Sequence, residues 1–273
     1  MKNKTLLFAA LASVFGWCCI SCEPNDPSKT GGGSGTYVAK GFSVSANKQV
    51  VFSPGNLQYQ ASTDTWRFAN HQYDYVGELN EEISPTNENW IDLFGWGTGN
   101  NPTNVSEDDA DYATFVDWGT NKIGKYKANT WRTLTMEEWK YLFLERPRAQ
   151  VLWGVATING VHGLILLPND WKTLDNITFV SGTSKDWSIN AFSIYEWEKM
   201  EKTGAVFLPV SSTRYGSKVD ESQIGLYWSS SYCANSQMPR ASAYDFYFYS
   251  TIVNPQHVAM ISLGLAVRLV KDL

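Results

Sequence analysis

The C-terminal part of the chain carries the run GLYWSSS at residues 225–231, followed by AYDFYF at 243–248 and GLAVRLV at 264–270. Each run is short and rich in aromatic or β-branched residues, which is typical of β-strands. In the second run, Phe246 and Phe248 alternate with more polar residues, so one face is apolar. The pattern predicts that the end of the chain folds back as paired strands whose outward side chains form one exposed patch.

Similar short runs precede this region and predict further strands. They lie at residues 42–45, 49–53, 57–60, 66–68, 163–168 and 205–209. Pro168 and Pro209 end the last two, because proline cannot donate a hydrogen bond to a neighbouring strand. Residues 80–111 are rich in Asn, Asp, Thr and Gly and predict a long irregular segment instead.

Two segments predict helices. In residues 135–144, Glu138 follows Thr135 at the spacing of a capping box. One face of this helix carries the apolar residues Trp139, Leu142 and Phe143. Residues 194–202 predict a second helix or helical turn. With the strands, these segments predict an α+β fold made mostly of short β-strands and long loops, with one or two helices.

Several stretches resemble known families. The segment WRTLTMEEW at 131–139 resembles the W-R-L-P-T-x-x-E-W segment of the formylglycine-generating-enzyme branch of the C-type lectin fold, with Thr133-Leu134 in place of Leu-Pro. The three C-terminal runs resemble the core of that branch. Their order, ending in G-x-x-V-R, is also similar to the Fibrobacter major paralogous domain and related lipoproteins of Bacteroidetes. The segments FSPGNLQY at 52–59 and WIDLFGWG at 90–97 resemble the Bacteroidetes group as well. The resemblance implies a C-type-lectin-like domain over residues 37–273.

The N-terminus has the pattern of a lipoprotein signal peptide. A positively charged end and an apolar run lead to Cys22, which follows the small residue Ser21. We expect residues 1–21 to be removed and lipid to be attached to Cys22. Cys18, Cys19, or an ordinary signal peptide with incidental cysteines, remain as alternatives.

The segment after this cysteine predicts a flexible tether at residues 22–36, because it is rich in Pro, Gly and Ser and nearly free of apolar residues. No later run reaches 18 apolar residues, the minimum for a membrane-spanning helix. We therefore expect an outer-membrane lipoprotein that is exposed at the cell surface.

Composition argues against a nucleic-acid partner. The chain carries 22 Lys and Arg against 27 Asp and Glu, so the formal net charge is −5 and the isoelectric point is near 5.3. Proteins that bind phosphate backbones need a basic surface. Twelve Trp in 273 residues indicate an aromatic core, an aromatic binding surface, or both.

The C-terminal segment has a biased composition. Residues 229–267 contain no Lys, Glu or Trp, whereas these three types total 36 between residues 22 and 228. The segment resembles the variable region of proteins diversified by retroelements, in which adenines of Asn codons are randomised. Gln237, Met238, Gln256 and Met260 would then be fixed positions. The alternative is that a β-rich segment disfavours Lys and Glu.

We expect ligand binding to use displayed residues of this segment. They are Tyr232, Asn235, Asp245, Tyr247, Tyr249, Ser250, Thr251, His257 and Ser262. Tyrosine offers a large contact area with few torsions, and serine adapts its hydrogen bonds.

The sequence predicts no catalytic residue, no metal site and no cofactor. The oxidase of the resembled branch uses a pair of copper-binding cysteines, and the folded part contains Cys233 alone. His71, His162 and His257 are far apart along the chain. Asp108, Asp109 and Asp111 could hold a structural calcium ion, but the loop lacks the glycine and distal glutamate of an EF-hand.

The sequence therefore favours a binding protein over an enzyme. Its expected partner is a protein or glycan at the cell surface, recognised by loops on a rigid β scaffold. One alternative is a glycan-binding accessory protein that uses exposed Trp and Tyr. A second is an enzyme of the formylglycine-generating type, against which the lone cysteine argues.

Overall fold

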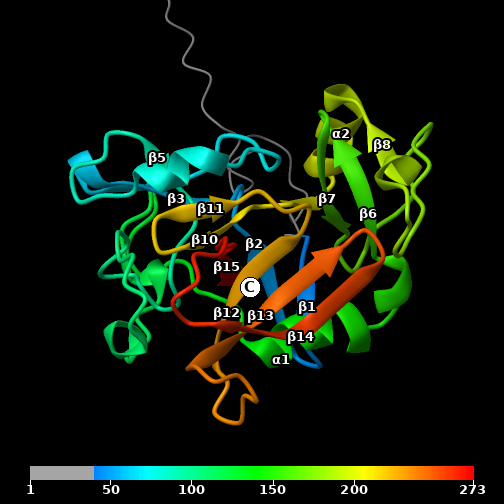
Figure 1. Cartoon of the computed structure of the whole chain (residues 1–273). Helices are drawn as coiled ribbons and strands as arrows, with labels where there is room; N and C mark the ends of the chain where they lie inside the picture. Colours follow the sequence, from blue (N-terminus) through cyan, green and yellow to red (C-terminus); the bar gives the residue numbers. More distant parts are fainter. Residues whose placement is uncertain (1–39) are drawn as a thin grey trace, which may run out of the picture. The chain divides into compact units, whose positions relative to one another are not determined.

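The computed structural model describes residues 40–273, which form one compact unit made of several small sheets and few helices (Figure 1). The expected α+β class is confirmed. The predicted signal peptide, the tether and Cys22 lie outside the described residues.

The strands of this unit form five sheets. The three-stranded sheets are β1 (Phe42–Ser45), β2 (Lys48–Phe52) and β15 (Val270–Asp272); β4 (Thr65–Phe68), β3 (Leu57–Gln60) and β5 (Trp90–Ile91); and β12 (Gly225–Tyr232), β13 (Ser242–Tyr249) and β14 (Ile252–Met260). The four-stranded sheet is β8 (Ala191–Phe192), β6 (Trp153–Ile158), β7 (Val161–Leu166) and β9 (Val206–Pro209). The two-stranded sheet is β10 (Thr213–Tyr215) and β11 (Lys218–Asp220).

The helices are short. The α-helices are α1 (Met136–Lys140) and α2 (Ile194–Lys202). The other turns are η1 (Ala61–Thr63), η2 (Gly77–Glu82), η3 (Asp109–Tyr112), η4 (Trp118–Thr120), η5 (Tyr141–Glu145), η6 (Ala149–Val151) and η7 (Trp187–Asn190), of which η5 is a π-helical turn and the rest are 3-10.

Capping boxes start both helices, although the sequence analysis identified only the one at Thr135. Thr135 and Glu138 form a reciprocal capping box at α1, and Ser193 and Glu196 form one at α2. The segment predicted as a helix over 135–144 is α-helical only to Lys140 and then continues as η5. Trp139, Leu142 and Phe143, which form the predicted apolar face, are all buried. The predicted face is therefore confirmed, although the helix changes from α to π at Tyr141.

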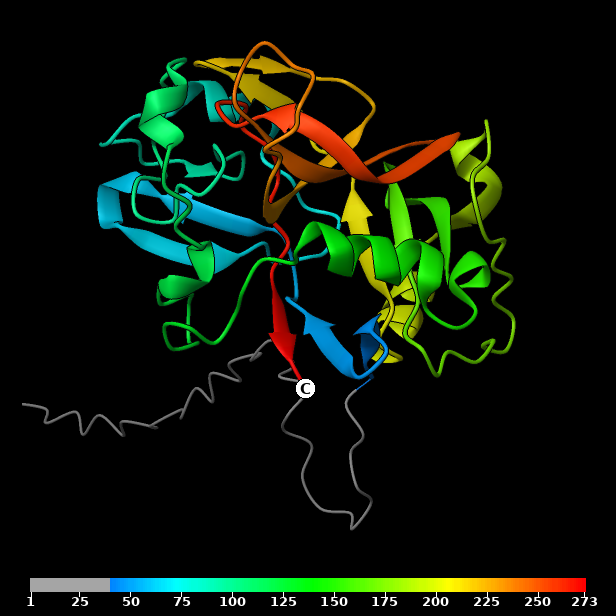
Figure 2. The ribbon, with the colours of Figure 1, turned by 90° about the horizontal axis from the view of Figure 1, so that it is seen from below.

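The two ends of the described unit meet in one sheet. β15 pairs antiparallel with β2, which pairs with β1, so the C-terminal strand lies beside the N-terminal hairpin (Figure 2). The prediction of one strand over 264–270 is wrong for most of its length. The segment is extended, but its carbonyls at Leu265, Val267 and Leu269 accept from the amides of Phe94, Leu57 and Ser53 in three different segments. A continuous ladder therefore cannot form before Val270.

The sheet β12-β13-β14 covers α1. Phe246 and Phe248 on β13 are fully buried and join a core cluster with Trp139 and Phe143. The loop between β12 and β13 projects away from the sheet at the bottom of Figure 1. The predicted alternation of β13 is thus confirmed at its inward face.

Tryptophans contribute mainly to the core. Those at positions 66, 96, 118, 131, 139, 197 and 228 are buried, and those at 90, 153, 171 and 187 are half-buried. No helix within residues 40–273 is both long enough and apolar enough to cross a membrane.

Candidate ligand-binding surface

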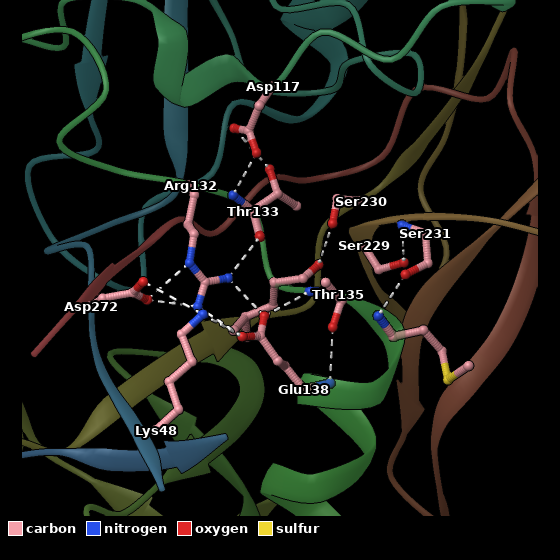
Figure 3. Close-up of polar contacts among 12 residues, drawn as sticks. Lys48, Asp117, Arg132, Thr133, Thr135, Glu138, Ser229, Ser230, Ser231 and Asp272 are labelled. Carbon is pink, nitrogen blue, oxygen red and sulfur yellow. Dashed lines mark hydrogen bonds and ion pairs between the residues drawn. The ribbon is translucent and has the colours of Figure 1, made fainter. Parts of the chain in front are cut away.

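A charged cluster fixes the start of α1 (Figure 3). Arg132 donates from Nη1 and Nη2 to the two carboxylate oxygens of Glu138, at 2.7 and 2.8 Å, and its Nη2 also donates to Asp272 at 2.7 Å. Lys48 Nζ lies 3.1 Å from Glu138 and 3.4 Å from Asp272. Two cations and two anions from β2, α1, β15 and the segment before α1 therefore neutralise one another.

The same cluster sets the protonation of Glu138. Burial alone would raise the pKa of Glu138, but hydrogen bonds from Arg132, the Thr135 amide and Lys48 lower it below its usual value. The carboxylate is consequently charged at neutral pH. Because each of its oxygens is occupied by these partners, Glu138 has a structural role rather than an acid/base role.

The run of three serines joins α1 to β12. Ser231 Oγ accepts the amide of Met136 at 3.0 Å, and the Ser230 amide donates to the carbonyl of Leu134 at 2.9 Å (Figure 3). Ser229 Oγ donates to the Tyr244 carbonyl on β13 at 2.6 Å. These contacts give the three serines a structural role and hold β12 and β13 in a fixed position against α1.

An open groove lies between the projecting loop and the strands that follow it. Its cavity volume is about 730 Å³. Its walls come from the loop that starts at Cys233 and from β13 and β14. The lining residues are Cys233, Asn235, Ser236, Gln237, Met238, Pro239, Tyr244, Gln256 and Val258. All of them fall within 26 consecutive positions of the C-terminal segment, and none carries a charge at neutral pH.

The groove has one wall fixed by hydrogen bonds. Gln256 Nε2 donates to Met136 Sδ at the start of α1, at 3.4 Å. The phenol of Tyr244 is hydrogen-bonded to the thiol of Cys233, and this contact raises the pKa of Tyr244. The strand side of the groove is therefore held against α1, whereas the loop side carries mostly exposed side chains.

The nine predicted binding residues do not form one patch. Tyr232, Asn235, Tyr249 and Thr251 are exposed, and Tyr247 and His257 are half-buried. Only Asn235 lines the groove. Tyr232 instead packs on Trp96, with ring centroids 5.7 Å apart, and Tyr249 packs on Trp187 at 6.0 Å.

Three of the nine residues are buried, and their assignment as displayed residues is wrong. Asp245 is 0% exposed, Ser250 is 2% and Ser262 is 1%. Asp245 faces Trp228 and forms an ion pair with His257. Ser250 lies at the β13–β14 turn, where its carbonyl accepts the amide of Ser184 from a covering loop. Ser262 lies two residues after the end of β14.

Three of the nine groove residues are positions that were expected to be fixed rather than displayed. Gln237, Met238 and Gln256, which the codon argument treats as fixed, line it together with Asn235. The signal was the long polar insertion between two strong strands, since hairpin loops of this kind project from a sheet. Side-chain identity alone did not indicate these positions.

Among residues 40–273, no cluster of three or more His, Cys, Asp or Glu that could hold a metal ion is found. Asp109 accepts from Arg240 Nη2 at 2.6 Å and from the Ala241 amide at 2.8 Å. Asp108 caps the amide of Ala110 at 3.0 Å. Asp109 therefore fastens the end of the groove loop to η3, whereas Asp108 caps η3 itself, so the two carboxylates serve different partners.

Exposed tryptophan is scarce in the described part of the chain. Trp90 is covered by the guanidinium of Arg67, which lies 3.7 Å from the ring centroid. The half-buried Trp187 stacks on His162 with centroids 5.1 Å apart and meets the edge of Tyr249. This aromatic cluster lies at the β13–β14 turn and is separate from the groove lining.

Comparisons with protein-family models, with curated proteins and with solved structures find no match to this chain.

Proposed function

We propose that the protein is a ligand-binding protein with a C-type-lectin-like domain, and that the groove of the C-terminal segment is its binding surface. The observation that carries the proposal is the origin of the groove, whose lining residues all lie between positions 233 and 258. The pairing of the chain ends through β2 and β15 and the antiparallel sheet at the C-terminus agree with the lectin-like architecture.

The mechanism would be shape and hydrogen-bond complementarity on a preformed wall. Phe246 and Phe248 anchor β13 in the core, on the same face of the strand as the groove residue Tyr244. A rigid wall lowers the entropy lost when a ligand binds. Asn235, Gln237 and Gln256 offer amide donors and acceptors, and Met238 and Val258 offer apolar contact. A lining without charge suits an uncharged stretch of a protein or glycan partner.

Diversification of the segment is not needed for this proposal. The groove combines residues reachable by adenine randomisation, such as Asn235, with residues that are not, such as Gln237 and Gln256. We propose binding by this surface in either case, with the protein acting as a binder rather than as an enzyme.

The proposal includes attachment of the protein to the outer membrane. Lipid on Cys22, followed by the tether at residues 22–36, would hold the domain at the surface while leaving it free to turn. Two or more acyl chains are enough for stable anchoring.

The test is selection of random peptides displayed on phage against the purified protein, together with a glycan array. Recovered binders are then measured on Gln256→Ala and Met238→Ala, which alter the groove, and on Tyr195→Ala. Tyr195 is 68% exposed on α2 and serves as the matched control. We expect the groove variants to weaken binding at least tenfold and the control to leave it unchanged. Equal binding to all variants, or turnover of a substrate by the purified protein alone, contradicts the proposal.

The aromatic cluster supports glycan binding as the second candidate function. Aromatic faces stack on sugar rings, and Trp187, His162 and Tyr249 are gathered at one turn. A discrete sugar on the array that is lost in Trp187→Phe but retained in Gln256→Ala favours this candidate over the groove.

A further inference from the structure

Asp245 and His257 form an ion pair across β13 and β14. His257 Nδ1 lies 2.9 Å from Oδ1 and 3.1 Å from Oδ2 of Asp245. The side chain of Asp245 is fully buried, whereas that of His257 is 37% exposed. The pair therefore joins a buried anion to a ring that reaches the surface.

The register of the sheet brings these side chains together. Asp245 is opposite Trp228 on β12 and opposite His257 on β14, so the three project from one face. The ring of Tyr247 stacks on His257 with centroids 4.9 Å apart. Asp245 and Tyr247 are the titratable groups that face the imidazole from β13, and its neighbours on β14, Gln256 and Val258, carry none.

The buried carboxylate governs the charge of the ring. Burial raises the pKa of Asp245, and the contact with His257 opposes that rise. The hydrogen bond to Asp245 raises the pKa of His257, although desolvation lowers it in part. An unpaired carboxylate in the interior is unfavourable because it loses its hydration without gaining a partner. The fold therefore favours the state in which Nδ1 carries a proton and donates to Asp245.

The opposite edge of the ring remains available. Nε2 lies across the imidazole from Nδ1 and is directed away from Asp245. The described part of the chain supplies no hydrogen-bond partner for Nε2. An imidazolium donates from both nitrogens, so Nε2–H is left without an acceptor among residues 40–273.

We propose that His257 is a carboxylate-binding contact, in which Asp245 orients the ring and Nε2–H donates to a carboxylate of a partner molecule that meets this face of the sheet. A carboxylate is favoured because a hydrogen bond between charged groups is roughly twice as strong as a neutral one. The contact is separate from the groove, since alternate residues of β14 face opposite sides of the sheet. A biological role for this contact rests on the proposed function as a binding protein. Carboxylate binding by His257 can itself be tested without the natural ligand.

The experiment is a pH titration of the three imidazoles by NMR of the labelled protein, with and without sodium acetate. His162 and His71 are internal controls. Nδ1 of His162 lies 2.9 Å from the neutral amide oxygen of Gln223, and Nδ1 of His71 lies 3.2 Å from the more exposed Asp74. We expect acetate to raise the pKa of His257 by about half a unit, a roughly threefold preference for the protonated ring. The two controls should change by much less.

Two variants complete the test. Asp245→Asn should lower the pKa of His257 and remove the acetate effect. If that variant does not fold, His257→Gln should abolish the acetate-induced shifts of the Tyr247 amide. Gln256→Ala alters the groove but should retain the acetate effect on His257. The proposal that the groove binds ligand and the proposal that His257 binds carboxylate can therefore fail independently. Equal responses of all three imidazoles to acetate overturn the inference.

Two further probes identify the source of the carboxylate. N-acetylaspartate methylamide represents an acidic peptide, and methyl glucuronide represents an acidic sugar. A larger effect of the first indicates a protein partner, and a larger effect of the second indicates a glycan. Absence of any effect of both probes and of acetate contradicts carboxylate binding.

Discussion

The indole of Trp139 on α1 lies nearly parallel to the phenyl ring of Phe246 on β13, with centroids 4.9 Å apart and an angle of 13° between the rings. Phe143 stacks on the same phenyl ring at 4.3 Å. A helix from the middle of the chain thus supports the strand that carries one wall of the groove. A substitution that removes this aromatic stacking should therefore also alter the shape of the groove.

The substitution Phe246→Ala should lower the free energy of unfolding by about 3–5 kcal/mol, because it removes a fully buried ring and leaves a cavity. Tyr249→Ala, on the outward face of the same strand, is the matched control and should cost less than about 1 kcal/mol. Urea unfolding measures both. A similar loss for the two variants would contradict the assignment of the inward face.

The ion pair between Arg132 and Glu138 should make the stability depend on pH. Glu138→Gln retains a side chain that can cap α1 but loses the charge, and we expect a loss of about 1–2 kcal/mol at pH 7 because the site is only partly buried. The pKa of Glu138 is lowered by folding, so its contribution is present above pH 4.5 and disappears as the pH falls through the folded value. Urea unfolding across this range should show the two proteins converging in acid. A difference that is independent of pH would contradict a charged role.

Asp92 should have the opposite dependence. Burial raises the pKa of Asp92 to about 6 from 3.8, despite hydrogen bonds from Asn80 and the Val76 amide. A raised pKa means that the folded state binds the proton more tightly, so stability from this group increases as the pH falls from about 6 toward 3.8. Relative to Asp92→Asn, the wild-type protein should gain about 2 kcal/mol between pH 7 and pH 4. A constant difference between the two proteins would show that Asp92 titrates normally.

The lipid anchor predicts a specific dependence on Cys22. Cys22→Ala should abolish incorporation of labelled palmitate and release the protein from the membrane fraction, because no acyl chain can then be attached. Cys19→Ala is the matched control and should retain both properties. Unchanged labelling of the Cys22→Ala protein would show that the lipid is attached to another residue, and would exclude Cys22 as the attachment site.

Local chemistry predicted much of the secondary structure. The capping box at Thr135, the helix at residues 194–202 and the strand at 57–60 agree with the structure because each depends on neighbours within four residues. The turn between β6 and β7 carried a further local signal. Asn159 and Gly160 have φ of 51° and 78°, as in the tight hairpin turns that this residue pair favours.

Other elements depend on partners that are distant in sequence. β14 contains Asn254 and Pro255 at a register shift against β13, which interrupts the alternation by which a strand is recognised. The segment 264–269 is extended because amides of three separate segments, at Ser53, Leu57 and Phe94, donate hydrogen bonds to its carbonyls. Neither feature follows from local composition.

The same limit applies to the candidate site. The C-terminal segment was the right region, since every groove residue comes from it. Which side chains face outward was predicted only in part, because Asp245 has an outward-facing register but is covered by Trp228 and His257. Burial of a polar strand residue is decided by packing against other elements, which a single sequence does not specify.

Mapping of amide chemical shifts tests the central claim most directly. A peptide or glycan recovered by selection is titrated into the labelled protein, and the shifted amides are located on the structure. We expect the largest changes at Asn235, Gln237, Tyr244 and Gln256, around the groove. Changes concentrated on α2 or on the β10–β11 hairpin, with the groove amides unaffected, would contradict it.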